Sequence, residues 1–222
     1  MVQKTHWTTD IKPELDSREV TLAGWVWDVR DVGRIKFIIL KDREGTVQVT
    51  VKRDNVSDDV WKTASSLNKE DVIMVRGIVR ASRIARAGVE VEPIDIRLLN
   101  KASKMPIDIW GNVEETALDL RLRYRAVDLK RWENITTFKA MSEAVRAMRE
   151  TLYGMGFVEV FTPKIIATST EGGAELFVVQ YFEKVAYLAQ SPQLYKEELT
   201  ASLERVFEIG PAYRAEKHDT TY

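Results

Sequence analysis

The sequence contains no cysteine and only two histidines among its 222 residues. The lack of cysteine excludes disulfide bonds, thiolate nucleophiles and cysteine-ligated zinc, and two histidines are too few for a multi-histidine metal site. No apolar run approaches the roughly 18 residues of a membrane-spanning helix, so we expect no membrane-embedded segment. The polar stretch at residues 1–6 has no apolar signal core, and we therefore expect a cytoplasmic protein.

Neither sign of charge dominates, because 33 lysines and arginines face 34 aspartates and glutamates. This balance argues against binding of polyanions by bulk charge, although a local basic surface could still bind nucleic acid. The P-loop, G-x-G-x-x-G and G-x-S-x-G patterns are also missing from the sequence. The length allows one large domain or two small ones.

Residues 19–51 contain three short runs rich in valine, isoleucine, tryptophan, phenylalanine and threonine, as in β-strands: Glu19–Val29, Ile35–Leu40 and Thr46–Val51. Aspartate and glycine at 31–34 and 42–45 favour tight reversals between them, which predicts an antiparallel meander.

A short helix and two further strands follow the meander. Ser57, with two aspartates after it, has the pattern of a helix N-cap. Strand character resumes at Val72–Arg80 and Val89–Leu99, where Pro93 and a change in apolar parity indicate a bulge or an edge strand. Three strands, one helix and two strands over about 100 residues is the element order of a five-stranded OB β-barrel, which we assign to residues 1–104.

The pattern of the second half predicts a mixed α and β domain over residues 134–222. Residues 105–133 keep neither the helical nor the strand period of apolar residues for long, and we predict a hinge there. A helix beginning at Asn134 has one apolar face and ends near two glycines. That face comprises Phe138, Met141, Val145, Met148 and Leu152. The remaining elements are strands at Phe157–Phe161, Phe177–Tyr181, Val185–Leu188 and Arg205–Ile209 around a helix at Gln193–Ala201. The fold class is therefore α+β.

Four polar segments could carry chemistry, each beside a predicted strand end. Gly156–Pro163 leads from the long helix into a strand that proline stops, or it is plain structural punctuation. Glu171 precedes paired glycines and could meet a small cation such as an α-ammonium group, or the segment is a flexible surface loop. Gln193 and Lys196 share a helix face suited to an anion, or they form a capped helix with a solvated lysine. Arg214 and Glu216 could hold the phosphate and amino group of one nucleotide, or they form a surface ion pair.

Taken together, these segments resemble the class II aminoacyl-tRNA synthetases. The proline-ended helix and strand Gly156–Pro163 is similar to motif 1, and Tyr213-Arg214-Ala215-Glu216 is similar to motif 2. Residues 170–177 (TEGGAELF) and 190–196 (QSPQLYK) resemble the amino-acid pocket of aspartyl-tRNA synthetases of the archaeal type. Members of this subgroup bind the anticodon with an amino-terminal OB barrel.

The resemblance implies activation of aspartate with ATP to aspartyl-adenylate, followed by transfer to the 3′ end of tRNA. It implies a catalytic role for Arg214, which would contact the α-phosphate and the attacking carboxylate. Glu216 would accept a hydrogen bond from the adenine amino group. The Mg²⁺ ligands and the motif 3 arginine of the family lie beyond residue 222, so we expect no metal site within this chain and an amino-terminal portion of a longer synthetase.

The resemblance also assigns the aspartate contacts. Glu171 would face the α-ammonium group, and Ser191 and Gln193 would add further contacts to the amino acid. Lys196 would meet the side-chain carboxylate, and the sister asparaginyl enzymes lack a cation at that position. Because neutral asparagine would leave a desolvated charge uncompensated, Lys196 argues for aspartate.

In the barrel, Arg30, Phe37 and Gln48 match anticodon-reading positions of the family. Phe37 would stack on an unstacked base, although strand parity also allows a core position for it. Trp27 and Arg86 are candidates for contacting the last anticodon base, on which discrimination between tRNA(Asp) and tRNA(Asn) depends.

Motif 1 of the family lies at a two-fold interface, so we expect a homodimer. Two alternatives stay open at this point. The chain could be an OB-fold RNA-binding module or truncated synthetase paralogue without charging activity, or a regulator or metabolic enzyme built on a synthetase scaffold.

Overall fold

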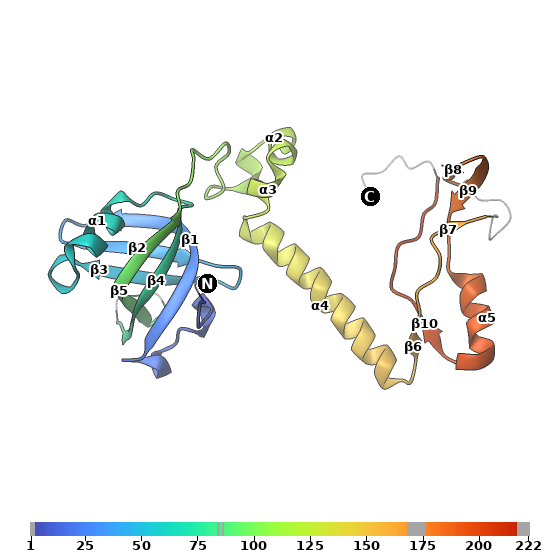
Figure 1. The fold of residues 1–222 in the computed structure, drawn as a ribbon, viewed down its shortest axis with the longest axis horizontal. Helices are drawn as coiled ribbons and strands as arrows, with labels where there is room; N and C mark the ends of the chain where they lie inside the picture. Colours follow the sequence, from blue (N-terminus) through green and yellow to red (C-terminus); the bar gives the residue numbers. More distant parts are fainter. Residues whose placement is uncertain (1–2, 84, 86, 168–175, 217–222) are drawn as a thin grey trace. The chain divides into compact units, whose positions relative to one another are not determined.

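The computed structural model describes residues 3–83, 85, 87–167 and 176–216. The chain divides into two compact units, residues 1–131 and residues 132–222 (Figure 1). Among the described residues, no helix is both long enough and apolar enough to cross a membrane.

Five strands of the first unit form a β-barrel. They pair in the order β1-β2-β3-β5-β4, and β4 pairs back to β1. The strands are β1 (Glu19–Asp31), β2 (Ile35–Lys41), β3 (Thr46–Lys52), β4 (Val72–Ala81) and β5 (Val89–Asn100). Short 3₁₀ turns lie at η1 (Thr8–Asp10), η2 (Pro13–Leu15) and η3 (Arg53–Asn55). The predicted meander and the order of the later strands are confirmed.

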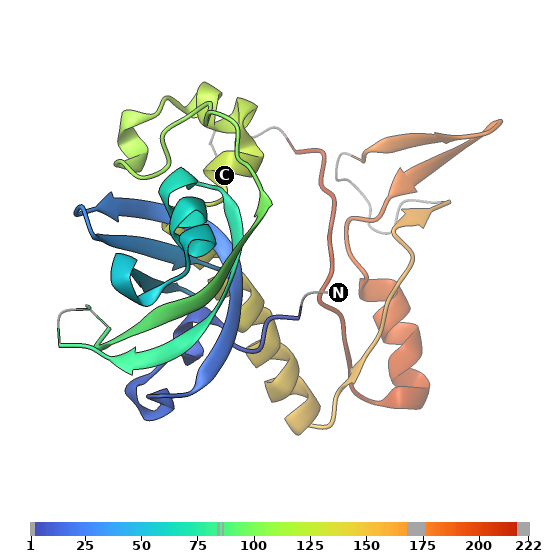
Figure 2. The same cartoon turned by 60° about the vertical axis from the view of Figure 1, so that its left-hand side comes forward.

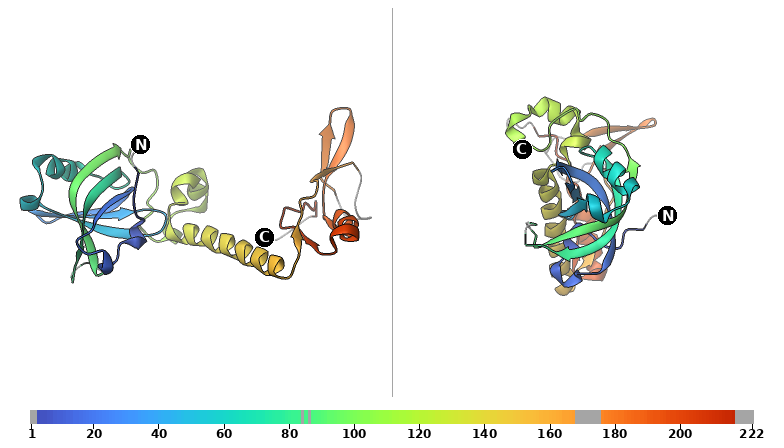
Figure 3. Two further views of the ribbon diagram at one scale, coloured as in Figure 1. Left: turned by 60° about the horizontal axis from the view of Figure 1, so that its bottom comes forward. Right: turned by 90° about the vertical axis from the view of Figure 1, so that its left-hand side faces the viewer.

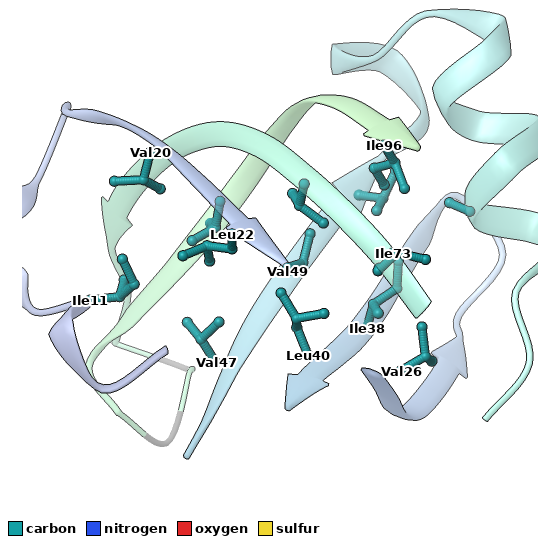
Figure 4. Packing of buried hydrophobic residues seen from close by; sticks show 14 of the residues in the cluster. Ile11, Val20, Leu22, Val26, Ile38, Leu40, Val47, Val49, Ile73 and Ile96 are labelled. Atoms are coloured by element: carbon teal, nitrogen blue, oxygen red, sulfur yellow. The ribbon is translucent and has the colours of Figure 1, made fainter. Parts of the chain in front are cut away.

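The barrel interior is filled by alternate residues of each strand (Figure 4). Ile38 and Leu40 of β2 and Val49 and Val51 of β3 are fully buried there, as the two-residue period of a strand requires. The register between β4 and β5 shifts near Pro93, where Gly77 pairs with Pro93 while its neighbour Arg76 pairs with Asp95. The predicted irregularity at Pro93 is therefore a bulge.

Helix α1 (Asp58–Ser66) packs against the barrel (Figure 2). The Ser57 hydroxyl accepts a hydrogen bond from the Val60 amide at 3.3 Å, which satisfies one free N–H group of the first turn. Val60 and Ala64 lie one turn apart and join the buried core. The predicted N-cap thus fixes where the helix begins.

Residues 105–131, within the segment predicted as a hinge, fold into short helices that cluster with the barrel: η4 (Val113–Glu115), α2 (Leu118–Arg123) and α3 (Arg125–Asp128). The Asp128 carboxylate is fully buried between the guanidinium groups of Arg121 and Arg131. The Trp110 indole donates a hydrogen bond to the backbone oxygen of Trp27 in β1 at 2.9 Å. These contacts tie the segment to the barrel.

The second unit begins with α4 (Trp132–Gly154), which starts two residues before the predicted position (Figure 3). Its other elements are β6 (Val158–Glu159), β7 (Ile165–Ile166), β8 (Val178–Tyr181), β9 (Lys184–Leu188), α5 (Gln193–Leu203) and β10 (Val206–Phe207). Strands β6 and β10 pair in parallel, and β7, β9 and β8 form an antiparallel sheet. The mixed α and β character is as predicted. Strands β6, β8 and β10 are shorter than predicted, β9 begins one residue earlier, and β7 was not predicted.

Candidate functional site

Backbone hydrogen bonds in the second unit join three segments that are distant in sequence. The Ala189 amide donates to the backbone oxygen of Lys164 at 3.0 Å. The Tyr213 amide donates to the backbone oxygen of Ala189, also at 3.0 Å. The segment after Pro163, the Gln190–Lys196 segment and the segment around Arg214 are therefore neighbours, as a shared site requires.

A buried carboxylate strengthens this junction. Glu208 accepts a hydrogen bond from the Thr162 hydroxyl at 2.8 Å and pairs with the Lys164 ammonium at 2.6 Å. Burial raises the pKa of the Glu208 carboxyl, but hydrogen bonds from Lys164 and Thr162 outweigh that effect and leave its pKa below the ordinary value. The sequence pattern did not reveal this ion pair, because Glu208 lies between apolar neighbours in a predicted strand.

The start of α5 is organised as predicted. The Ser191 hydroxyl accepts a hydrogen bond from the Gln193 amide at 3.1 Å, and the Gln193 side-chain amide donates to Glu197 at 2.8 Å. Lys196 lies one turn after Pro192 and is half-buried. Within the described residues, its ammonium group makes no hydrogen bond or ion pair. The positive charge is thus available for an anionic ligand.

The two residues assigned to the nucleotide lie close together. The Arg214 guanidinium and the Glu216 carboxylate are 3.9 Å apart, with 59% and 46% of their side chains exposed. At this separation the pair is weak, and both groups can reach a ligand. Glu171, assigned to the α-ammonium group, lies outside the described residues.

The barrel brings three predicted anticodon contacts onto one outer face. Arg30 pairs across β1 and β2 with Phe37, and Phe37 pairs across β2 and β3 with Thr50. Gln48 lies two residues from Thr50 on the same side of β3. Phe37 is half-buried and is not among the core residues, so the core alternative for it is wrong.

A hydrogen-bond network holds the Gln48 side chain against β5. Its amide nitrogen lies 3.0 Å from Glu90 Oε2 and 3.1 Å from Thr50 Oγ1. The Thr50 hydroxyl donates to the same Glu90 oxygen at 2.7 Å. The contact with Glu90 was not predicted, because β3 and β5 are far apart in the chain.

Trp27, the fourth predicted barrel contact, packs elsewhere. Its ring lies 5.7 Å from the Trp110 ring, and the Lys41 ammonium lies 3.7 Å from its centre. It sits at the register shift between Val26 and Asp28. Arg86 lies outside the described residues.

Two known families match most of the sequence. Residues 20–99 match the family described as OB-fold nucleic acid binding domain, and residues 117–222 match that described as tRNA synthetases class II (D, K and N). The Aspartate--tRNA(Asp) ligase of Pyrobaculum aerophilum is 61% identical over 220 residues, which cover 99% of this chain and 51% of that protein.

Residues 117–222 carry a domain of the class II aminoacyl-tRNA synthetases.

Other relatives agree with this match. The Aspartate--tRNA(Asp/Asn) ligase of Methanocaldococcus jannaschii is 47% identical, with 98% of this chain and 50% of that protein covered. The crystal structure of asparaginyl-tRNA synthetase from Pyrococcus horikoshii complexed with asparaginyl-adenylate superposes with a TM-score of 0.89 at 36% identity, covering 99% of this chain and 50% of that one. The chain thus spans about half the length of these synthetases.

The comparisons confirm the predicted fold class. An OB fold is followed by part of a class II synthetase domain, in the order that the sequence motifs indicated. The junction at Lys164, Ala189 and Tyr213 therefore joins the segments that resemble synthetase motif 1, the amino-acid pocket and motif 2.

Proposed function

We propose that the protein carrying this chain is an aspartate–tRNA ligase, which activates aspartate with ATP and transfers it to the 3′ end of tRNA(Asp). The relatives named as aspartate ligases support this function, and so does the half-buried Lys196 ammonium, which has no partner within the described residues. Lys196 carries the proposal because a fixed cation favours the aspartate carboxylate over the neutral amide of asparagine.

In the proposed first step, the α-carboxylate of aspartate attacks the α-phosphorus of ATP and pyrophosphate leaves. The protein mainly positions two anions and stabilises the developing charge. Arg214 would bridge the attacking carboxylate and the α-phosphate through its planar set of donors. Glu171, Ser191 and Gln193 would orient the amino acid. In the second step, a hydroxyl of the terminal adenosine attacks the activated carbonyl and releases AMP.

Class II synthetases in general use ATP and Mg²⁺. The chemistry of Arg214 and Glu216 fits ATP, with donors for phosphate and an acceptor for the adenine amino group. No cluster of three or more histidine or carboxylate side chains suited to a metal occurs in the part of the chain that the structure describes. We therefore assign no Mg²⁺ ligand to these residues.

We further propose that the barrel of residues 1–104 binds the anticodon through Arg30, Phe37 and Gln48, and that residues 134–222 belong to the catalytic domain. A homodimer and a cytoplasmic location complete the proposal. The tRNA(Asn) is a second candidate substrate, because the relative from Methanocaldococcus jannaschii is named an Asp/Asn ligase.

The test is aspartylation of tRNA(Asp) transcripts by the complete protein that contains this chain. We expect charging with aspartate, and a loss of at least about 100-fold in kcat/KM for Arg214→Ala, since one charged transition-state contact contributes about 3 kcal/mol. The control is Arg205→Ala, which among the described residues removes a hydrogen bond to the Met155 backbone oxygen. Binding of tRNA without charging would favour the RNA-binding module instead.

A further inference from the structure

We infer that Glu208 is a positioning residue for aspartate activation. Its ion pair with Lys164 holds the segment that binds aspartate and the segment that carries Arg214 in the mutual alignment that the reaction requires. The inference rests on the proposed function and adds to it a residue that acts through Lys164 and the backbone of Ala189, not by contact with either substrate.

The Glu208 side chain takes over where the backbone pairing of β6 and β10 ends. The Val160 amide donates to the backbone oxygen of Phe207 at 2.9 Å, which continues the parallel ladder. Two residues later, the Thr162 amide donates to Glu208 Oε1 at 3.3 Å, and the Thr162 hydroxyl donates to Oε2 at 2.8 Å. One carboxylate therefore fixes the chain that leaves β6, beyond the reach of the paired strands.

Lys164 joins the two sheets of the second unit. Its ammonium group lies 2.6 Å from Glu208 Oε1 and 3.1 Å from Thr162 Oγ1, beside β6 and β10. Its backbone oxygen accepts the Ala189 amide after β9, and the next residue, Ile165, begins β7. Strands β7 and β9 belong to the antiparallel sheet (Figure 1). A shift of this side chain away from its carboxylate partner would therefore disturb a backbone bond in the other sheet.

That backbone bond leads to the residues assigned to the substrates. Ala189 is buried, and the Gln190–Lys196 segment with the proposed aspartate contacts begins at the next residue. The Ala189 oxygen accepts the amide of Tyr213, the neighbour of Arg214. The positions of the aspartate and of the α-phosphate thus depend on one short series of bonds. An error of about 1 Å between reacting groups can slow a reaction about 100-fold, so loss of the first bond should lower the rate.

The ion pair is shielded enough to hold this alignment. The Glu208 side chain is 3% exposed and that of Lys164 is 25% exposed. Water and salt weaken an ion pair less when it is buried than when it lies on the surface. In Glu208→Gln the side chain keeps its size and can still hydrogen-bond to Thr162, but it no longer attracts the ammonium group.

The same unit contains a matched control. The side chain of Glu159 in β6 is 9% exposed and pairs with Arg149 at 2.9 Å, and the Tyr153 hydroxyl donates to it at 2.6 Å. Both partners belong to α4 and not to a segment assigned to a substrate. Glu159→Gln therefore breaks a similarly buried ion pair without loosening the bonds around Ala189.

The experiment measures aspartate-dependent ATP–pyrophosphate exchange by the complete protein. We expect Glu208→Gln to lower kcat at least about tenfold, while the KM values for aspartate and for ATP change less than about threefold, because each segment still binds its own substrate. Glu159→Gln should keep kcat within about twofold of the wild type. Active-site titration through the aspartyl-adenylate counts competent molecules, so a smaller folded fraction is told apart from a slower reaction.

A second variant tests the bond itself. Lys164→Met should lower kcat about as much as Glu208→Gln does. The double variant should lose no more than either single variant, because all three lack the same ion pair. Losses that multiply in the double variant would show that the two residues act separately and would overturn the inference.

Hydrogen exchange of the complete protein, followed by mass spectrometry, needs no catalysis. Peptides that contain the Ala189 and Tyr213 amides should exchange faster in Glu208→Gln than in the wild type, and at the wild-type rate in Glu159→Gln.

Other results would overturn the inference in distinguishable ways. Wild-type kcat in Glu208→Gln, an equal loss in Glu159→Gln, or a change confined to the KM for one substrate would each contradict the positioning role. If the wild-type protein shows no exchange with aspartate, the proposed function fails. Unchanged hydrogen exchange at Ala189 and Tyr213 in Glu208→Gln would refute the link between the ion pair and these segments, whatever reaction the protein catalyses.

Discussion

Asp42 shows how one carboxylate can hold a turn in place. It accepts hydrogen bonds from the Lys4 ammonium at 2.7 Å and from the Thr8 amide and hydroxyl at 3.0 and 2.8 Å. The Glu44 and Gly45 amides in the turn between β2 and β3 also donate to it. Burial raises the pKa of Asp42, but these hydrogen bonds outweigh that effect and lower the pKa to about 2.

The lowered pKa predicts a pH-dependent contribution to stability. The folded-state value of about 2 lies below the unfolded value of about 3.9, so the contribution is complete above pH 4 and is lost as the pH falls through 2. Asp42→Asn should lower the free energy of unfolding at pH 7 by about 1–2 kcal/mol, a difference that vanishes near pH 2.

Urea unfolding across this pH range measures the effect of Asp42→Asn. The control is Asp54→Asn, whose exposed carboxylate pairs with exposed Arg34 and should contribute little. An equal loss of stability at pH 7 and pH 2 would show that the charge of Asp42 is not the cause.

Residue types predicted some site features and missed others. The cap by Ser191 and the helical position of Lys196 followed from local spacing, and the outward position of Phe37 was one of two options that strand parity allowed. The pair of Lys164 with Glu208 and the contact of Glu90 with Gln48 join residues 44 and 42 positions apart, the differences between their residue numbers. Local sequence does not encode such contacts, because they depend on which segments pair.

At the scale of elements, the periodicity of α4 was predicted and its surroundings were not. Phe138, Met141 and Met148 line the predicted apolar face, and each is more than half exposed within the structure described. An exposed apolar stripe of nearly three helical turns is costly in water, which supports the proposed dimer interface.

A charge placed in this stripe should weaken the proposed dimer. We expect Met141→Lys to raise the dimer dissociation constant by at least about tenfold, because a lysine buried in an apolar interface loses its hydration. Ala147→Lys, on another exposed face of α4, should leave the constant unchanged. Sedimentation equilibrium of the chain measures both, and a monomeric wild-type chain at micromolar concentration would contradict the proposed interface.

Strand lengths differ between the two units for a physical reason. In the barrel, each strand has a partner on both sides, and the predicted strands match the observed ones to within two residues. In the second unit, β6 and β10 pair only over Val158–Glu159 and Val206–Phe207. A run of β-favouring residues becomes a strand only where a partner extends alongside it.

At the scale of the whole molecule, residues 105–131 carry contacts that no local pattern predicts. The Lys130 ammonium pairs with Glu70, and the buried Arg131 side chain donates to the backbone oxygens of Asp108 and Gly111. These bonds span up to 60 residues and hold the segment in the first unit. A sequence without helical or strand period can therefore be well ordered by long-range polar contacts.

The central claim is that Lys196 selects aspartate. The most direct measurement is kcat/KM for ATP–pyrophosphate exchange by the complete protein, with aspartate and with asparagine as the amino acid. The wild type is compared with Lys196→Leu, and Lys184→Leu is the control. We predict that Lys196→Leu loses at least about 100-fold with aspartate but little with asparagine, since only aspartate pairs with the cation. Wild-type activity with aspartate in Lys196→Leu would contradict the account.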